Sequence, residues 1–317
     1  MKTIFYHTGE DLLTDGRFAA TIGFFDGMHL GHRFLIDELQ KLARQNGLQT
    51  MAVTFEHHPR QVLQPQWQPQ LLTTLKEKEA LLAATGIDLL VVLRFDEQMA
   101  RLTARDFMQQ VLSERLQVKL LLTGYDHRFG HDRSEGFDDY VRYGRQIGMD
   151  IRQSTPFNLN GQPISSSRIR RLLNEGNVSE AADCLGHPYR LSGTVVHGKQ
   201  IGRQLGFPTA NIQLDDSCLL VPANGVYAVS VAIDGRNGTW QGMTNIGTRP
   251  TFEGHRQTIE TNIFDFNGDI YQQHLSIALI ERLRSEQHFD TPEALVRQME
   301  RDAQQAQQNN TTICTKH

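Results

Sequence analysis

The chain has 317 residues, which is longer than a domain with a single hydrophobic core usually is, so we expect two domains. Hydrophobic residues make up 39% and charged residues 21%, which is typical of a soluble globular protein, and no apolar run approaches the ~20 residues that a membrane span requires. The formal net charge of -4 argues against a nucleic-acid binder that works through a general basic field. Three cysteines, Cys184, Cys218 and Cys314, give neither a CxxC pair nor a disulfide framework, which favours a reducing cytoplasm.

The first part of the chain, up to about residue 185, alternates short apolar runs with longer helical patterns. We predict strands at 18–25, 49–55, 88–95 and 118–124, and helices at 31–47, 74–86 and 104–116. Strands that are apolar on both faces and alternate with helices indicate a parallel sheet covered on both sides. The pattern therefore predicts a Rossmann-like α/β domain whose ligands bind at the carboxyl ends of the strands.

The segment Thr21–His32, "TIGFFDGMHLGH", lies between the first predicted strand and the first predicted helix. A helix N-terminus attracts phosphate through its N–H groups, and glycines at three positions let a triphosphate approach the backbone. His29 and His32 can donate hydrogen bonds to phosphate oxygens as negative charge develops. A zinc pair and a simple helix cap are the alternatives, and we disfavour zinc because no third ligand stands at metal-ligand spacing nearby.

This segment resembles known sequences at two levels. "HLGH" resembles the His-x-Gly-His signature of the nucleotidylyltransferase superfamily, and "GFFDGMHLGH" is similar to the opening motif of its flavin-adenylating branch. The superfamily transfers a nucleotidyl group from a nucleoside triphosphate to an acceptor and releases pyrophosphate. The resemblance implies catalytic roles for His29 and His32, and nucleotide binding by Gly23, Phe25, Asp26 and Gly31.

A second segment of this half, "PISSSRIRRLL", combines three serines with three arginines at a predicted helix start. Serine hydroxyls and unpaired N–H groups suit a phosphate, although an ordinary cap on a basic surface helix fits equally well. The stretch resembles the Ile-Ser-Ser-Thr/Ser-x-x-Arg motif of the same superfamily. That resemblance implies that Ser166, Ser167 and Arg170 bind the phosphates of ATP.

The loop Leu121–Arg133, "LLTGYDHRFGHDR", follows the fourth predicted strand and so emerges at the ligand-binding edge. It is similar to the Gly-x-Asp-Phe-x-Phe-Gly loop of the flavin-adenylating family, which implies flavin binding by Asp126 and Phe129. The alternative is a polar loop with Phe129 packed in the core.

The pattern changes near Gly186, where strand signals begin to follow one another without helices. We predict strands at 189–196, 209–214, 225–233, 239–247, 258–266 and 274–283, followed by one helix at 291–306. Thr291 suits the cap of that helix and Pro292 its first turn, whereas the polar tail after Arg301 is expected to fray. The pattern predicts an antiparallel β-barrel with a C-terminal helix, and a domain boundary between residues 186 and 187.

The segment "HGKQIGRQLGFPTAN" in this second half combines spaced glycines, two cations and two oxygen-bearing side chains. A flexible backbone around Lys199 and Arg203 could wrap a phosphate. Thr209 and Asn211 are two apart on an extended segment, so both can face one Mg²⁺. A bulged, glycine-rich hairpin explains the same pattern without a ligand.

"GFPTAN" resembles the Pro-Thr-Ala-Asn signature of riboflavin kinases, in which the Thr and Asn hold the metal of Mg-ATP. "GVYAVSV", "TNIGTRPTF" and "IETNIFDF" then occur in the order of that family. The resemblance implies that Glu260 is the catalytic carboxylate. It also implies roles for residues that bind metal, nucleotide or flavin, namely Thr209 and Asn211 for Mg²⁺, Gly198, Lys199, Gly202 and Arg203 for the nucleotide, and Arg284 and Phe289 for the flavin.

Taken together, residues 18–303 resemble the bifunctional prokaryotic FAD synthetase family, in which an FMN adenylyltransferase domain (here 1–186) precedes a riboflavin kinase domain (here 187–317). The resemblance implies that ATP phosphorylates riboflavin to FMN and that a second ATP converts FMN to FAD, with Mg²⁺ as cofactor. We expect these small molecules as partners and no nucleic acid, membrane or obligate protein partner, in the cytoplasm. The alternatives are an enzyme with another acceptor, such as a cytidylyltransferase, and a flavin-binding regulator without catalysis.

Overall fold

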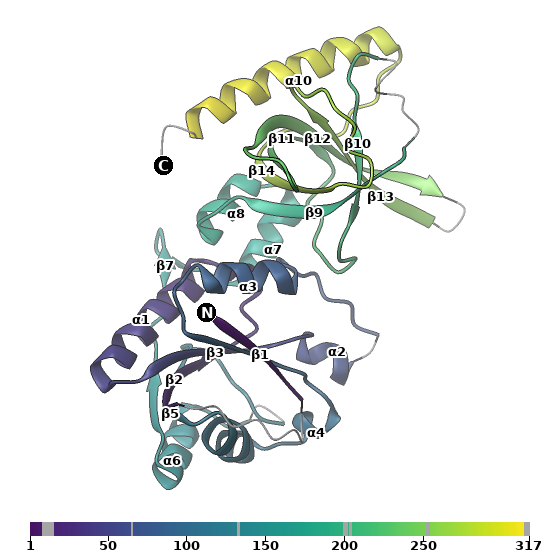
Figure 1. Cartoon of the computed structure of the whole chain (residues 1–317). Helices are drawn as coiled ribbons and strands as arrows, with labels where there is room; N and C mark the ends of the chain where they lie inside the picture. Colours follow the sequence, from purple (N-terminus) through teal and green to yellow (C-terminus); the bar gives the residue numbers. More distant parts are fainter. Residues whose placement is uncertain are drawn as a thin grey trace. The chain divides into compact units, whose positions relative to one another are not determined.

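The computed structural model of the chain describes residues 1–7, 16–64, 66–131, 134–198, 202, 205–251 and 254–313, with side chains omitted at 249–251, 254–256 and 309–313. The chain forms two compact units, Met1–Ser165 and Ser166–His317, which Figure 1 shows as ribbons. Two candidate residues, Lys199 and Arg203, lie outside the described residues.

The first unit contains a six-stranded sheet in the order β1-β4-β3-β2-β5-β6, and every neighbouring pair of strands is parallel. The strands are β1 Lys2–Tyr6, β2 Phe18–Ile22, β3 Gln49–Phe55, β4 Leu89–Leu93, β5 Val118–Thr123 and β6 Asp150–Gln153. All residues of β2 and β4 are buried, as expected for central strands covered on both faces. This arrangement confirms the predicted Rossmann-like domain, to which the structure adds β1 and β6 at the two edges.

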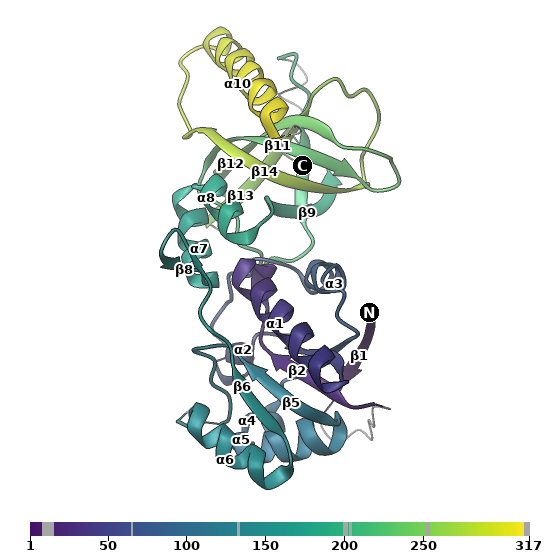
Figure 2. The same ribbon diagram turned by 90° about the vertical axis from the view of Figure 1, so that its left-hand side faces the viewer.

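Helices cover both faces of this sheet (Figures 1 and 2). The helices α1 Leu30–Asn46 and α3 Leu75–Ala83 share one hydrophobic core with the sheet, whereas η2 Phe107–Arg115 and α6 Phe137–Ile147 share the other. Short helices connect these elements, namely η1 Asp26–Met28, α2 Pro59–Leu63, α4 Glu97–Ala100 and α5 Ala104–Asp106, and a small hairpin, β7 Asn158–Leu159 with β8 Gln162–Pro163, closes the unit.

Two predicted elements of this unit differ from the structure in conformation as well as in extent. The first predicted strand ends at Ile22 instead of residue 25, because Phe25 adopts a left-handed conformation and a 3-10 turn follows it. The predicted α-helix over 104–116 is α-helical only at Ala104–Asp106 and continues as a π-helix, whose wider hydrogen-bonding pattern cannot be read from apolar periodicity.

The second unit is a closed barrel with strand order β10-β13-β12-β11-β14-β9, and all its pairs are antiparallel. The strands are β9 Tyr189–Val196, β10 Ala210–Leu214, β11 Gly225–Ile233, β12 Trp240–Thr251, β13 Gly254–Ile263 and β14 His274–Arg284. Every strand overlaps a predicted one, which confirms the predicted barrel. The helix α10, Pro292–Ile313, packs against β11, β12 and β14.

We predicted that the chain frays after Arg301, and this prediction was wrong, because the helix α10 continues beyond that residue. Asp302 and Ala306 are buried, with 3% and 0% of their surface exposed, and the helix continues to Ile313. Glutamine is a good helix former, and Asp302 faces an arginine on the barrel, so tertiary contacts stabilise a segment that looks like a polar tail.

The helices α7 Ser166–Glu175 and α8 Val178–Leu185 belong to the second compact unit. The backbone N–H of Ala223 donates to the carbonyl of Leu173 at 3.0 Å, and Arg282 Nη1 donates to the carbonyl of Glu175 at 3.3 Å. These contacts tie α7 to the barrel, and the Ser179 hydroxyl ties α8 to it by donating to the carbonyl of Ile280 at 3.2 Å. The compact units therefore divide at Ser165/Ser166, and the domain boundary at 186/187 stays a prediction.

Among the helices that the structure describes, none is both long and apolar enough to cross a bilayer.

Candidate functional site

The N-terminus of α1 lies at the carboxyl end of β2 and is capped by a histidine. His29 Nδ1 accepts a hydrogen bond from the backbone N–H of His32 at 3.3 Å. Because Nδ1 acts as the acceptor, the proton of a neutral His29 ring is on Nε2. The capping alternative is therefore true for His29, and it fixes which ring nitrogen can donate to a ligand.

The two histidines also stack on each other, with ring centroids 3.6 Å apart and an interplanar angle of 14°. The ring edge of Phe25 contacts His32 at 5.3 Å between centroids. Burial lowers the pKa of His32 well below its usual value, and the positive charges of His29, Lys78 and His127 lower it further. His32 is therefore neutral at physiological pH, and its Nδ1 is a buried atom for which the described residues supply no hydrogen-bond partner.

The glycines of this segment allow the backbone to approach closely. A Cβ on Gly31 would come within 3.2 Å of the His29 ring and 3.9 Å of the carbonyl of Ile164. A Cβ on Gly23 would come within 3.2 Å of the Phe25 ring. The sequence-predicted residues Gly23, Phe25, Gly31 and the histidines are thus assembled around one turn, as the motif indicates.

Asp26, which we predicted to contact the nucleotide, is buried with 3% exposed. Its Oδ1 accepts hydrogen bonds from the backbone N–H groups of Leu72 at 2.8 Å and Thr73 at 3.2 Å. The Thr73 hydroxyl in turn accepts a hydrogen bond from the N–H of Gly27. These bonds join the glycine-rich turn to the segment that leads into α3, and direct contact of Asp26 with nucleotide stays a prediction.

One residue at this edge escaped the sequence analysis. Lys78, on α3, is 2% exposed, and its Nζ lies 4.0 Å from the centroid of the Phe24 ring. Leu75, Lys78 and Leu82 are spaced by three and four residues, so the lysine falls on the apolar face of its helix. A lysine at an apolar-face position of a predicted helix could therefore have identified Lys78 as a candidate from the sequence.

The structure separates the two predicted flavin-binding residues of the loop after β5. Asp126 is exposed, whereas Phe129 is buried in the core, where its ring stacks on Tyr140 at 4.3 Å and packs against Phe107. The packed-core alternative thus describes where Phe129 lies, and its role with flavin stays a prediction.

Ser166, Ser167 and Arg170 form the first turns of α7. Ser167 is exposed, and the other two are half-buried. They belong to the second compact unit, while the histidines belong to the first, and their joint action on ATP stays a prediction.

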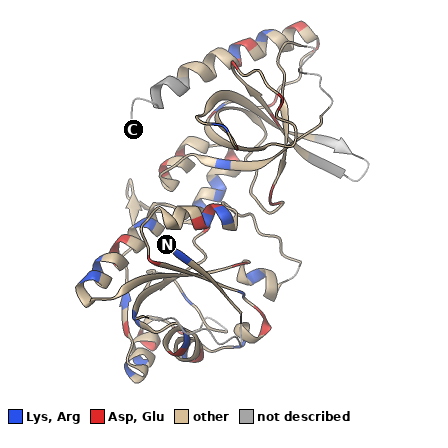
Figure 3. Ribbon diagram, in the orientation of Figure 1, with Lys and Arg blue, Asp and Glu red and all other residues tan. Residues whose placement is uncertain are grey.

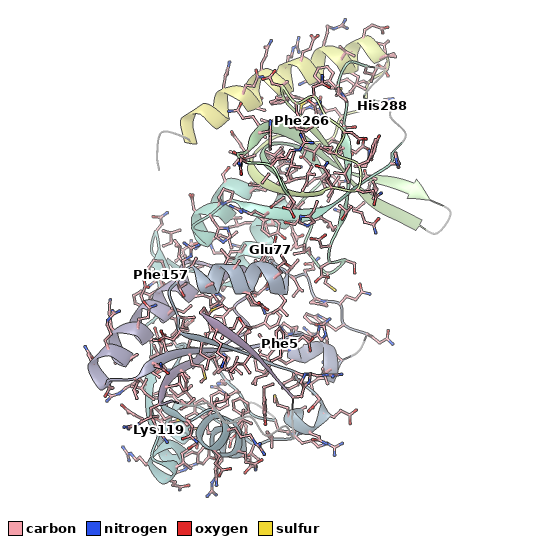
Figure 4. The ribbon with its side chains drawn as sticks, in the orientation of Figure 1. Phe5, Glu77, Lys119, Phe157, Phe266 and His288 are labelled. Carbon is pink, nitrogen blue, oxygen red and sulfur yellow. The ribbon has the colours of Figure 1, made fainter. Side chains whose placement is uncertain are left out.

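Two cavities lined by described residues of the barrel share one residue, Thr209. The larger, about 600 Å³, is lined by Pro208, Thr209, Ala210 and the Phe266–Tyr271 segment. The smaller, about 400 Å³, is lined by a set that includes Thr209, Glu260, Arg284 and Phe289. Figure 4 labels Phe266 from the larger cavity and His288 from the smaller. Five sequence-predicted residues therefore line the smaller cavity, since Gly202 does so as well.

Strand register aligns the predicted base with two amides. Asn211 on β10 pairs with Glu260 on β13, which pairs on its other side with Asn245 on β12. Directly paired residues project from the same face of a sheet, so the three form one row. Thr209, two residues before Asn211, projects in the same direction as the row.

Two predicted glycines approach this row closely. A Cβ on Gly198 would come 2.1 Å from Asn211 Nδ2, and a Cβ on Gly202 would come 2.3 Å from the carbonyl of Phe207 and 3.3 Å from the Thr209 hydroxyl. Asn262, which the sequence analysis missed, donates from Nδ2 to the carbonyl of Pro208 at 2.7 Å and so anchors the segment before Thr209.

An ion pair forms part of the lining of the smaller cavity. Arg284 Nε donates to both carboxylate oxygens of Asp302, at 3.1 and 2.9 Å, and the side chains are 15% and 3% exposed. Gln298 donates a further hydrogen bond to Asp302 at 2.9 Å. The Arg284 guanidinium lies 5.6 Å from the centroid of the Phe289 ring, so the pair connects α10 to both predicted flavin contacts.

The donor set near Thr209 suits a hard cation. The Thr209 hydroxyl, the Asn211 amide and the Glu260 carboxylate are oxygen donors, which Mg²⁺ prefers. Within the described part of the chain, no three His, Cys, Asp or Glu side chains gather as a metal site. The residues present fit Mg²⁺ better than they fit zinc.

Comparison with known proteins shows the same order of two parts. The family model for FAD synthetase matches residues 13–168, and the model for riboflavin kinase matches residues 185–310. The bifunctional riboflavin kinase/FMN adenylyltransferase of Escherichia coli (strain K12) is 40% identical over 282 residues, which cover 89% of each chain. That of Listeria monocytogenes is 37% identical over 96% of each chain.

A solved structure from Streptococcus pneumoniae, described as a macrolide-efflux protein, matches with a TM-score of 0.88 and 33% identity. The match covers 96% of this chain and 98% of that one. Because both family models match in order and the relatives align over nearly their whole length, the chain belongs to the family of bifunctional riboflavin kinase/FMN adenylyltransferases.

Proposed function

We propose that this protein makes FAD from riboflavin in two ATP-dependent steps, a phosphorylation in the barrel and an adenylyl transfer in the Rossmann-like unit. The observation that carries this proposal is the occurrence of both family matches in one chain, at 13–168 and 185–310. Two positions support it: His29 caps α1 after the carboxyl end of β2, and Glu260 lines the smaller barrel cavity.

In the kinase step, riboflavin occupies the smaller barrel cavity. Glu260 accepts the proton of the ribityl 5′-hydroxyl while that oxygen forms a bond to the γ-phosphorus of ATP. The bond from the γ-phosphorus to the bridging oxygen breaks, and ADP leaves with FMN as the product. The row of Asn211, Glu260 and Asn245 supports this assignment, because both amides can orient the carboxylate.

Thr209 and Asn211 would hold Mg²⁺, which supplies positive charge to the phosphates of ATP. Gly198 and Gly202 support this assignment because they lie where any larger residue would displace the Asn211 amide or the segment before Thr209. The larger cavity also contains Thr209, and its aromatic residues Phe266 and Tyr271 suit an adenine ring.

In the transfer step, a phosphate oxygen of FMN attacks the α-phosphorus of a second ATP. The bond to the bridging oxygen of the β-phosphate breaks, and pyrophosphate leaves. The FMN phosphate is already an anionic nucleophile, so alignment and electrostatic stabilisation suffice. His29 supports this role because its cap places a proton on Nε2, and Ser166, Ser167 and Arg170 would bind phosphate as the family motif implies.

The test is to incubate the purified protein with riboflavin, ATP and Mg²⁺ and to separate the flavins by chromatography. Both FMN and FAD should appear in sequence. FMN without FAD would indicate another acceptor for the transferase unit, and flavin binding without either product would indicate a regulator. We also propose a cytoplasmic enzyme that needs no obligate protein partner, on the basis of its cysteine spacing and its small-molecule substrates.

A further inference from the structure

Lys78 is a buried cation at the edge of the sheet where the phosphates are expected. Its Nζ lies 3.4 Å from the Thr54 hydroxyl and 3.4 Å from the carbonyl of Phe55, at the carboxyl end of β3. The ring of Phe24, at the end of β2, lies 4.0 Å away. Its contacts are therefore two long hydrogen bonds and one aromatic face.

This lysine has no close counter-ion in the described part of the chain, where no carboxylate lies within 4.0 Å of Nζ. Asp26 on η1 and Glu79 on α3 act on it from farther away, and the Asp26 carboxylate is occupied by the N–H groups of Leu72 and Thr73. Burial dominates and lowers the pKa of Lys78 to about 8. A buried ammonium without a close counter-ion is costly, and such groups concentrate at functional sites.

The charge of Lys78 acts on His32 of the histidine pair. It is one of the three charges that lower the pKa of His32, together with His29 and His127. Both signs of charge alternate along α3 (Figure 3), but Lys76 is exposed whereas Lys78 faces the sheet. Of the two lysines that the structure describes on α3, only Lys78 is buried on the side of the sheet.

We propose that Lys78 is a charge-supplying residue of the adenylyltransferase site, which stabilises the triphosphate polyanion held at the N-terminus of α1. This inference rests on the proposed function. Since Lys78 is 2% exposed, its charge acts through the Phe24 ring that it contacts and through its effect on His32, as a positioning residue. The negative charge of bound ATP provides a counter-charge that the described residues do not supply within 4.0 Å of Nζ, and binding raises the pKa of Lys78 in turn.

The kinetic test uses Lys78→Met, which keeps the shape and removes the charge, and Lys78→Arg, which keeps the charge. Lys78→Met should lower kcat/KM for ATP in FMN adenylylation by ~10–100-fold, and Lys78→Arg should recover much of this loss. Riboflavin phosphorylation by the same protein should be unchanged. The matched control is Lys76→Met on the exposed face of α3, which should alter neither step. Wild-type adenylylation by Lys78→Met would overturn the proposal.

A second readout does not depend on turnover. The imidazole pKa of His32, measured by NMR in the full chain and assigned with His32→Gln, should rise in Lys78→Met because one nearby positive charge is gone. It should stay near the wild-type value in Lys78→Arg. No rise in Lys78→Met would show that the lysine charge does not reach the site. Continued FAD synthesis by a His29→Ala, His32→Ala protein would instead refute the proposed site itself, so the two failures are distinguishable.

Discussion

The imidazole rings of His29 and His32 lie face to face, 3.6 Å apart between centroids. His29 also caps the helix through the His32 backbone. Two rings in this arrangement cannot both become charged without repulsion, and each depends on the other for its position. We therefore expect them to act as one unit, with consequences for mutagenesis and for pH.

Replacement of His29 and His32 by Ala should slow FMN adenylylation by ~10²–10³-fold for each single change, because each removes a donor to developing charge. The double mutant should lose little more than either single mutant, since groups that act as a unit are not additive. Conversion of FMN to FAD, followed by chromatography, measures this effect. His29→Asn retains a capping acceptor and controls for helix stability. Multiplicative losses would contradict the coupled pair.

Acid should destabilise the protein through His32. Its folded-state pKa lies below the usual value of 6.5, so the unfolded chain binds the proton more readily. The stability that this group contributes is fully present above pH 6.5 and is lost as pH falls through the folded-state pKa. Urea unfolding between pH 5 and pH 8 should show a steeper acid loss for wild type than for His32→Gln. Parallel profiles would contradict the assignment.

The buried ammonium of Lys78 should have the opposite signature at alkaline pH. Its pKa is lowered from 10.5 to about 8, so burial of the charged form costs stability below pH 8, and the cost disappears as pH rises to 10.5. The shift corresponds to about 3 kcal/mol for this nearly inaccessible side chain. Lys78→Met should exceed wild type in thermal stability at pH 7.5, and the difference should shrink by pH 10. A constant difference would indicate a purely steric effect.

Glu260→Gln should reduce riboflavin phosphorylation by ~10²–10⁴-fold, because the amide cannot accept the hydroxyl proton. Conversion of added FMN to FAD should continue at the wild-type rate, which makes the second activity an internal control. Since Gln has nearly the size of Glu and leaves the strand pairing of residue 260 with Asn211 and Asn245 in place, folding should be preserved. Loss of both activities in a folded protein would contradict the division of labour between the units.

Asp302→Ala should cost about 3–5 kcal/mol of stability, because it leaves the Arg284 guanidinium buried without its partner. It should also raise the KM for riboflavin more than it lowers kcat, since Arg284 and Phe289 line the same cavity. The double variant Arg284→Met, Asp302→Leu replaces the pair by apolar side chains and should recover stability without recovering KM. Recovery of both would show that the pair is structural only.

The sequence by itself determined the local structure and the order of the two parts. The predicted strands at 49–55 and 225–233 coincide with β3 and β11, and the helix predicted to end at residue 47 ends there, where Gly47 caps α1 in the left-handed conformation. The histidine and Pro-Thr-Ala-Asn motifs are equally local, since each joins residues within one turn or one strand. Such features depend on residues that are close together in the sequence. They can therefore be recognised from a short stretch of consecutive residues.

Tertiary structure alone decided which distant side chains meet. Asp26 bonds to Thr73, Lys78 to Thr54 and Arg284 to Asp302, across 47, 24 and 18 residues of sequence. It also placed Phe129 in the core and extended α10 through a tail that reads as polar. Sequence periodicity does not identify these partners. The position of a buried charged side chain depends on how whole helices pack against a sheet, and that packing is defined only in the assembled core.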